Sequence, residues 1–128
     1  RRVLFRSDRV KGWGSKVLCS ATTVDEARWL EAQGVHAIIA QGVEAGGHRG
    51  MFLTGDLTTQ VGTFALLPQV LRAVQLPVIA AGGVGSVADV RRLGECGVEA
   101  AIIGRALYTG DIDLAEALAA VEPARGAS

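Results

Sequence analysis

A histidine within a glycine-rich segment is the residue best suited to proton chemistry in this chain. His48 follows Gly46 and Gly47, so no bulky neighbour shields its imidazole. With an unperturbed pKa of about 6.5, an imidazole can accept or donate a proton near neutrality. Taken by itself, such a loop histidine is more often a solvated surface residue than a catalytic base. The second histidine, His36, falls between a predicted helix end and a strand start, where we expect a structural role.

Two short glycine segments have the composition of a phosphate-binding site. Gly82-Gly83 follows one apolar run, and Gly104-Arg105 follows the next. Glycine lets the backbone approach an anion and adopt positive φ, and N–H groups in such turns and at helix starts point at negative charge. We therefore predict that both segments bind one phosphate. Two alternatives stay open: the glycines only form tight turns, or Gly83-x-Gly85-x-x-Ala88 is a weak dinucleotide-binding fingerprint.

The elements that must position these residues repeat as strand, turn and helix. From Lys16 onwards, short apolar runs alternate with segments of helical periodicity, which is typical of βα units. The predicted strands cover residues 16–20, 37–42, 77–81 and 100–103; the predicted helices cover residues 24–33, 63–74, 86–95 and 112–121. A loop over residues 43–62 interrupts the rhythm. Loops longer than about 12 to 15 residues in a compact domain are usually functional or disordered.

Several residues predict where the helices begin, end and face the core. Thr23 and Glu26 have capping-box spacing, Ser86 is an expected N-cap, and Gly34 and Gly97 are expected to end helices. Pro68 should weaken its helix or move the start to near Leu67. In the last helix, the expected inward residues are Leu114, Ala117, Leu118 and Val121.

The fold class that these units indicate is α/β, with four βα units forming the C-terminal half of a TIM (βα)8 barrel. A whole barrel needs about 250 residues. A small doubly wound sheet is the alternative, and it fits less well because the strands are apolar on both faces. In a TIM barrel the active site lies at the C-terminal strand ends, with phosphate after the last two strands. The glycine pairs fall at those positions.

The expected domain organisation is simple. Residues 15–122 form the half-barrel, and residues 123–128 form a frayed tail. We expect residues 1–14 to be a non-native extension, because residues 2–7 resemble a translated sequencing adapter. The first and fourth strands of an isolated half-barrel would lack neighbours, so we expect the chain to aggregate, to dimerise or to remain partly molten.

Composition removes several classes of function. Basic and acidic residues number 13 each, and no stretch concentrates basic charge, so we expect no nucleic-acid partner. No apolar run approaches the roughly 18 to 20 residues of a membrane helix, and no signal peptide is evident, so we expect no membrane partner and a cytoplasmic location. Cys19 and Cys96 lack metal-ligand spacing; we expect buried thiols and no metal.

Three segments, residues 39–50, 64–70 and 77–83, together resemble the nitronate monooxygenase (2-nitropropane dioxygenase) family. The resemblance implies a TIM barrel that uses FMN to oxidise alkyl nitronates with oxygen. His48 matches the histidine of the family's Glu-x-Gly-Gly-His motif, which acts beside the flavin as a base or substrate-positioning group. By the same match, Gln41, Gly46 and Gly47 would line the flavin, and Gly82 and Gly83 would hold its phosphate.

Parts of the sequence also resemble other protein families. Flavin-dependent enoyl-ACP reductases share the Gly-Gly-His and Ala-Ala-Gly-Gly segments. Residues 84–121 are more similar to the phosphoribosyl isomerase of histidine biosynthesis, whose catalytic aspartates have no counterpart here, and this suggests a chimera joined near Gly83. Because both families hold a phosphate at these strand ends, Gly104 and Arg105 keep that role. An inert phosphate-binding half-barrel is a further alternative.

These resemblances also set the expected partners. The substrate would be a small nitronate-like molecule. Either a homo-oligomer or a missing N-terminal half-barrel would complete the sheet. The N-terminal strands would normally complete the flavin pocket, so we expect the 128-residue chain alone to be inactive.

Overall fold

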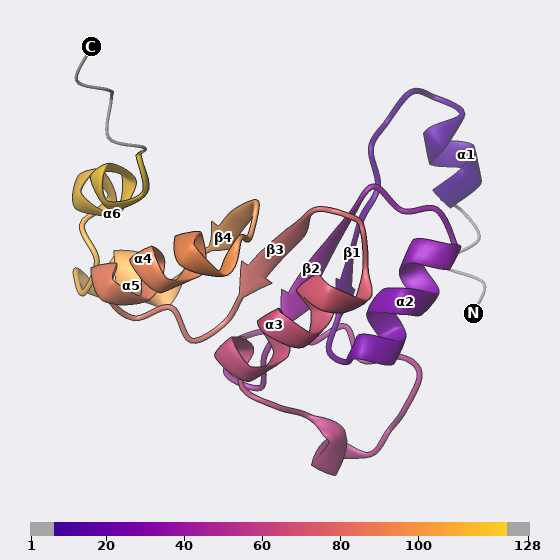
Figure 1. The fold of residues 1–128 in the computed structure, drawn as a ribbon, viewed down its shortest axis with the longest axis horizontal. Coiled ribbons are helices and arrows are strands. Elements are labelled where there is room, and N and C mark those ends of the chain that lie inside the picture. Colours follow the sequence, from indigo (N-terminus) through magenta and orange to yellow (C-terminus); the bar gives the residue numbers. More distant parts are fainter. Residues whose placement is uncertain (1–6, 123–128) are drawn as a thin grey trace.

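The strands of this chain form one parallel sheet. A computed structural model describes residues 7–122. Its strands are β1 (Leu18–Ala21), β2 (Ala37–Gln41), β3 (Val78–Ala81) and β4 (Ala100–Ile102), in the order β1-β2-β3-β4, and each neighbouring pair is parallel (Figure 1). Four parallel βα units in one sheet are the arrangement of half a TIM barrel, as predicted.

The connections between strands are helical. The helices are α1 (Ser7–Lys11), α2 (Val24–Ala32), α3 (Thr63–Ala73), α4 (Val87–Cys96), α5 (Arg105–Thr109) and α6 (Leu114–Val121), with a 3-10 turn η2 (Leu57–Thr59). Helices α2 and α3 pack on each other and on the sheet, whereas α4 packs on α6 (Figure 1). The sequence did not predict α5. Residues 123–128, the predicted frayed tail, and residues 1–6 lie outside the described residues, and the extension over residues 1–14 stays a prediction.

The predicted helix boundaries are largely confirmed. The Thr23 hydroxyl accepts a hydrogen bond from the Glu26 main-chain N–H at 3.2 Å, and the Ser86 hydroxyl accepts one from that of Asp89 at 3.1 Å. Gly34 and Gly97 have φ values of 72° and 87°, in the left-handed region that glycine occupies without strain. The capping box of α2 is only half formed, because the Glu26 carboxylate binds other partners.

Pro68 does not move the start of α3. The helix begins at Thr63 and continues through Pro68, so the expected shift to near Leu67 was wrong. The Glu44 carboxylate accepts hydrogen bonds from the main-chain N–H and the hydroxyl of Thr63, at 2.9 and 3.0 Å. This cap from outside the helix satisfies an N–H that has no partner within it, and stabilises the first turn ahead of the proline.

The apolar stripe predicted for α6 is mostly exposed. Ala117 is buried, but Leu114 and Leu118 are each 56% exposed and Val121 is exposed as well. In the described chain α6 packs mainly on α4, where Val121 reaches within 3.6 Å of a Cβ placed on Gly94. One neighbouring helix covers only a narrow side of α6, so the remaining apolar residues face away from it.

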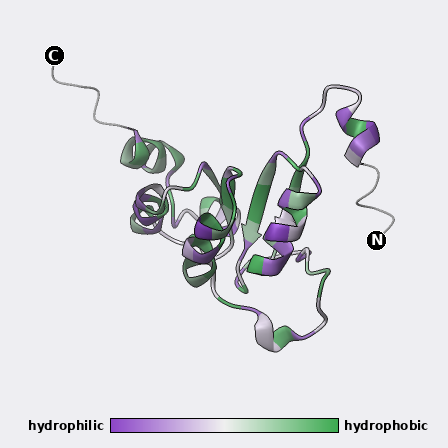
Figure 2. Cartoon of the chain, turned by 45° about the vertical axis from the view of Figure 1, so that its right-hand side comes forward, coloured by the Kyte–Doolittle hydropathy of each residue, from purple (hydrophilic) through white to green (hydrophobic). Residues whose placement is uncertain are grey.

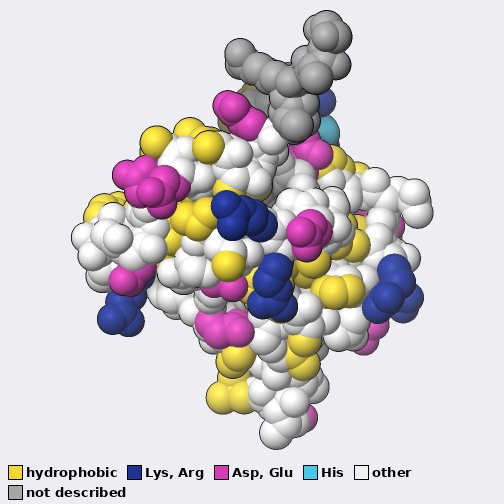
Figure 3. All heavy atoms as spheres, turned by 60° about the vertical axis from the view of Figure 1, so that its left-hand side comes forward, with side chains coloured by type: hydrophobic (Ala, Val, Ile, Leu, Met, Phe, Trp, Pro, Cys, Tyr) yellow, Lys and Arg dark blue, Asp and Glu magenta, His cyan; other side chains and the backbone are white. Residues whose placement is uncertain are grey.

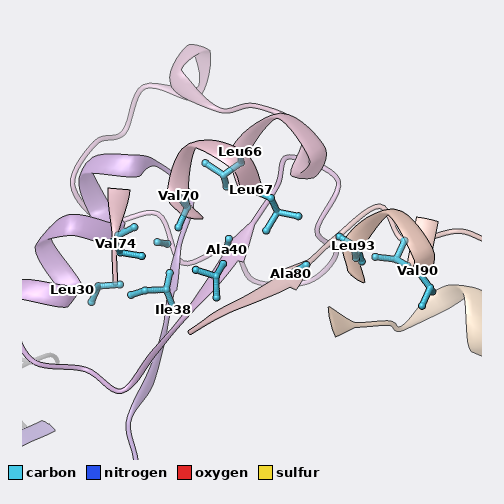
Figure 4. Close-up of a cluster of buried hydrophobic side chains, with 14 of the residues drawn as sticks. Leu30, Ile38, Ala40, Leu66, Leu67, Val70, Val74, Ala80, Val90 and Leu93 are labelled. Carbon is cyan, nitrogen blue, oxygen red and sulfur yellow. The ribbon is translucent and has the colours of Figure 1, made fainter. Parts of the chain in front are cut away.

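The core lies between the sheet and its helices. It combines strand residues with residues of α2, α3 and α4, among them Leu30, Ile38, Ala40, Leu66, Leu67, Val70, Val74, Ala80, Val90 and Leu93 (Figure 4). The strands are largely hydrophobic, whereas the helices also carry hydrophilic residues (Figure 2). Burying the helix-facing side of the sheet supplies the main favourable free energy of folding.

The opposite face of the sheet is less covered than predicted. Ile38 and Ala40 are buried, but the alternating Ile39 and Gln41 of the same strand are only half-buried. Successive residues of a strand point to opposite faces, so the half-buried set shares one face. Cys96 is exposed, and the expectation of a buried thiol was wrong there; Cys19 is half-buried. Cys96 is the last residue of α4, where the helix is exposed.

Candidate functional site

A hollow lies at the C-terminal ends of three neighbouring strands. Its volume is about 760 Å³. Register places Gln41 of β2 beside Ala81 of β3, and Ala81 beside Ile102 of β4, and all three residues line the hollow. This is the end of the sheet at which a TIM barrel builds its active site.

The two predicted glycine segments meet at this hollow. Gly82 and Gly83 follow β3, Gly104 and Arg105 follow β4, and all four residues line it. Gly82 and Gly83 have φ values of 107° and 68°. A Cβ atom on Gly82 would lie 2.6 Å from the main-chain nitrogen of Ala45, so the turn can come this close to the β2 loop only without a side chain. Neighbouring turns thus share one space, as the sequence predicted.

Main-chain N–H groups in these turns are free to bind an anion. Within residues 7–122, the N–H groups of Gly83, Val84 and Gly104 donate no hydrogen bond, whereas that of Gly85 donates to Asp89 at 3.0 Å. Free N–H groups in glycine turns, at a hollow that Arg105 also lines, suit a phosphate dianion. The residues therefore fit a phosphate group. Within the same range, no three His, Cys, Asp or Glu side chains are grouped so that they could bind a metal ion.

Glu44 lines the same hollow and is not among the residues that the sequence predicted for the site. Burial alone would raise the pKa of this carboxyl. Hydrogen bonds from the main-chain N–H groups of Glu44 itself and Thr63 and from the Thr63 hydroxyl, with the nearby charge of Arg49, hold the pKa below its usual range. The carboxylate is therefore ionised but engaged by Thr63. Its spacing, 19 residues before the helix it caps, gives no local sequence signal.

Gln41 connects the hollow to the segment that carries His48. Its Oε1 accepts a hydrogen bond from the main-chain N–H of Gly50 at 2.7 Å, and its Nε2 donates to the main-chain oxygen of His48 at 3.4 Å. Gly46 lines the hollow, but Gly47 and His48 do not. His48 is exposed beside it. The structure thus brings together Gln41, Gly46 and the two glycine turns, and places Gly47 and His48 at the rim.

The long loop that holds His48 is tied at several points. The main-chain N–H of Val43 donates to the oxygen of Val61 at 2.8 Å, which closes the two ends of the loop on each other. Arg49 donates a hydrogen bond to the side chain of Gln60 across the loop. A compact loop with joined ends is a frequent carrier of functional residues.

His36 has the structural role that its position predicted. Its Nδ1 accepts a hydrogen bond from the main-chain N–H of Val17 at 2.9 Å, at the start of the β1 strand region. This contact lies at the N-terminal end of the strands, away from the hollow at their C-terminal end.

Charged side chains of both signs are scattered over the surface. In Figure 3, the basic and acidic side chains on the side of α4 to α6 alternate with apolar and uncharged atoms. Within residues 7–122, no helix combines the length and the apolar character needed to cross a bilayer.

Comparison with known proteins identifies one family along almost the whole chain. The family model described as nitronate monooxygenase matches residues 5–121. The nitronate monooxygenase of Paraburkholderia phytofirmans is 45% identical over 97 residues, which is 76% of this chain and 26% of that protein. The chain therefore spans little more than a quarter of this curated relative.

Solved structures agree with the sequence match. The nitroalkane oxidase of Streptomyces ansochromogenes superposes with a TM-score of 0.69 at 42% identity, covering 76% of this chain and 28% of that one. FabK of Thermotoga maritima gives a TM-score of 0.65 at 35% identity, covering 82% and 31%. The family match runs through residue 83 without a break, so the suggested chimera and its isomerase segment over residues 84–121 receive no support.

Proposed function

Because the chain belongs to the nitronate monooxygenase family, we propose that it is part of an FMN-dependent oxidoreductase that oxidises alkyl nitronates with oxygen. The observation that carries this proposal is the meeting of Gly82-Gly83 and Gly104-Arg105 at one hollow beside Gln41. That hollow lies where a TIM barrel holds a phosphate. The family match and the phosphate geometry are independent supports.

The two turns would hold the ribityl phosphate of FMN. The free N–H groups of Gly83, Val84 and Gly104 would donate hydrogen bonds to the phosphate, and the positive charge of Arg105 would balance its negative charge. The Glu44 carboxylate lies in the same hollow, but its Oε2 is turned to Thr63 and shielded by the charge of Arg49. This engagement limits its repulsion of the anion.

The flavin ring would lie towards the β2 loop, along Gln41, Gly46 and Gly47. FMN supplies the electron chemistry, and the protein supplies position and charge. His48, at the rim, accepts a proton from the substrate at its imidazole or holds the substrate by a hydrogen bond. Its position is set from the hollow side by Gln41, whose amide contacts both His48 and Gly50.

Flavin binding tests this proposal directly. Purified protein supplemented with FMN and freed of excess should retain a flavin absorbance band that is shifted from that of free FMN. A complete barrel that contains this segment and retains no flavin contradicts the proposal, and tight binding of a phosphoribosyl ligand instead would favour a sugar-phosphate isomerase.

The role of His48 needs a separate experiment. In a complete barrel that contains this segment, His48→Ala should abolish nitronate oxidation and leave the flavin bound. Equal loss of flavin and of turnover would show that His48 is structural and not catalytic.

A flavin-dependent enoyl-ACP reductase is the second candidate. The segments that this class shares are Gly46-Gly47-His48 and residues 80–83, of which Gly46, Ala81, Gly82 and Gly83 line the same hollow. Turnover of an enoyl thioester with no turnover of nitronates would favour the reductase. Neither activity, with phosphate binding retained, would indicate the inert half-barrel.

The partner of the sheet is also a proposal. β1 and β4 each pair on one side only within the described chain, and Leu18 and Ile102 on these edge strands are 47% and 52% exposed. A further half-barrel, from a longer chain or a second copy, would pair with these edges and complete the site. The cytoplasmic location stays a prediction.

A further inference from the structure

Glu26 is a fully buried carboxylate that joins helix α2 to the loop carrying His48. Its side chain has 0% exposure. Oε2 accepts hydrogen bonds from the main-chain N–H and hydroxyl of Thr22, at 2.6 and 2.8 Å. Oε1 accepts hydrogen bonds from the main-chain N–H groups of Phe52 and Leu53, at 2.7 and 3.1 Å. One side chain at the start of α2 therefore holds a loop segment that follows it by 26 and 27 residues.

Only a carboxylate satisfies these partners. The main-chain N–H groups of Thr22, Phe52 and Leu53 can only donate, and they approach both oxygens of the side chain. A glutamine has one oxygen, and its NH2 group would face donors on one side or the other. A buried donor left without an acceptor is costly, so the amide would release one of the two segments.

The charge of Glu26 is maintained by the same contacts. Burial alone would raise the pKa of the carboxyl, but the hydrogen bonds from Phe52, Thr22 and Leu53 outweigh burial and lower the pKa below its usual range. We call the contacts of the Glu26 carboxylate with Thr22, Phe52 and Leu53 the clamp. The clamp is formed when the carboxyl is ionised.

A second contact fixes the same part of the loop. The Phe52 ring packs edge-on against Trp29, with ring centroids 5.4 Å apart and planes inclined at 63°. Trp29 lies one helical turn after Glu26 on α2, so both contacts come from one side of the helix. Between His48 and these contacts, Gln41 holds Gly50. The loop leaves His48 between the strand end and this clamp.

We propose that Glu26 is a positioning residue for His48, acting through the main chain of Phe52 and Leu53. It touches neither the hollow nor His48. It fixes the middle of the loop on α2, so that the segment from His48 to Leu53 has one conformation. This role rests on the proposed function, in which His48 is the residue that handles the substrate proton.

The test compares two variants at the start of α2 in the 128-residue chain without flavin. Glu26→Gln removes the clamp, and Thr23→Ala removes the N-cap of the same helix but none of the hydrogen bonds to the loop. Amide hydrogen exchange is measured by NMR, together with the resonance position of the His48 imidazole. In Glu26→Gln, the Phe52 and Leu53 amides should exchange about tenfold faster or more, and the His48 resonance should shift.

The control separates positioning from general loss of stability. In Thr23→Ala, the His48 resonance and the ratio of Phe52 to Gly50 exchange should remain as in the unaltered chain. Equal changes in both variants, or no change of His48 in Glu26→Gln, overturn the proposal.

A measurement on the unaltered chain covers the case in which Glu26→Gln does not fold. The Phe52 and Leu53 amides should be protected to at least the level of Gly50, and exchange at the rate of an open loop overturns the clamp. None of these measurements uses FMN. A complete barrel that keeps the clamp but binds no flavin contradicts the proposed function alone, whereas flavin binding without protection at Phe52 and Leu53 contradicts Glu26 alone.

Discussion

The amide group of Gln41 joins the strand end to His48, through a hydrogen bond of 3.4 Å from Nε2 to the main-chain oxygen of His48. The same side chain accepts from Gly50 at 2.7 Å and lines the hollow. A single glutamine thus links the proposed flavin site to the segment that carries the proposed base. The linkage needs a donor and an acceptor on one side chain, which glutamine provides.

Replacing Gln41 should weaken flavin binding and disturb this linkage. Gln41→Glu keeps the acceptor for Gly50 but sets an oxygen against the His48 oxygen, and adds a negative charge near a bound phosphate. FMN affinity, measured by fluorescence titration, should fall by about tenfold, which corresponds to about 1.4 kcal/mol. Gln41→Met removes the hydrogen bonds without adding charge, so its FMN affinity should fall by less than that of Gln41→Glu. An unchanged FMN affinity in Gln41→Glu would show that Gln41 is not part of the flavin site.

Gly82 should be the glycine least tolerant of a side chain. Gly82→Ala places a Cβ atom 2.6 Å from the Ala45 nitrogen, at φ 107°, and combines backbone strain with overlap. We expect urea unfolding to show a loss of about 3 kcal/mol or more. Gly97→Ala is the matched control, because Gly97 has φ 87° with no atom within 4 Å of an added Cβ. It should lose about 1 to 2 kcal/mol, and equal losses would show that the close approach to Ala45 is not rigid.

Acid should weaken the fold through Glu26. Its folded-state pKa lies below the ordinary glutamate value of about 4.3. The unfolded chain therefore takes up this proton first, and the stability that the ionised group contributes is complete above about pH 5 and is lost as pH falls through the folded pKa. Glu26→Gln should cost about 2 kcal/mol at pH 7 and should flatten the dependence of urea stability on pH. Asp25→Asn is the matched control, because it removes an exposed carboxylate of the same helical turn and none of the hydrogen bonds to Glu26, and it should cost less free energy of unfolding at pH 7. Curves of Glu26→Gln and of the unaltered protein that run parallel would contradict the argument.

The open edges of the sheet should drive self-association. Leu18→Lys and Ile102→Lys place charge on the exposed side chains of β1 and β4 and should lower the association constant measured by analytical ultracentrifugation. Leu57→Lys changes a residue that is 69% exposed on the loop turn η2, and should have no such effect. A chain that stays monomeric at all concentrations, or equal effects of all three variants, would show that the edges are not the contact surface.

The sequence predicted the elements better than the long-range contacts. Local signals, such as the hydroxyls of Thr23 and Ser86 and the glycines after helices, depend on neighbours within four residues, and the structure confirms them. The placement of both glycine turns at one hollow was also predictable, because strand ends of a parallel sheet meet at one edge.

The contacts that the sequence could not reveal join distant segments. Glu26 looked like half of a capping box, but its carboxylate binds Phe52 and Leu53 across 26 and 27 residues. Glu44, at the start of the loop that leads into α3, caps that helix from 19 residues away, and such a contact gives no local signal. The apolar stripe of α6 was misread because periodicity shows that residues share a face but not whether anything covers it.

Comparison of FMN with riboflavin tests the central claim most directly, because the two flavins differ only in the phosphate. If the turns at Gly82-Gly83 and Gly104-Arg105 bind that group, FMN should bind at least about tenfold more tightly than riboflavin in fluorescence titrations. The advantage should shrink in Arg105→Met. Equal affinities for the two flavins, or an advantage that is unchanged in Arg105→Met and in Gly82→Ala, would contradict the shared phosphate site.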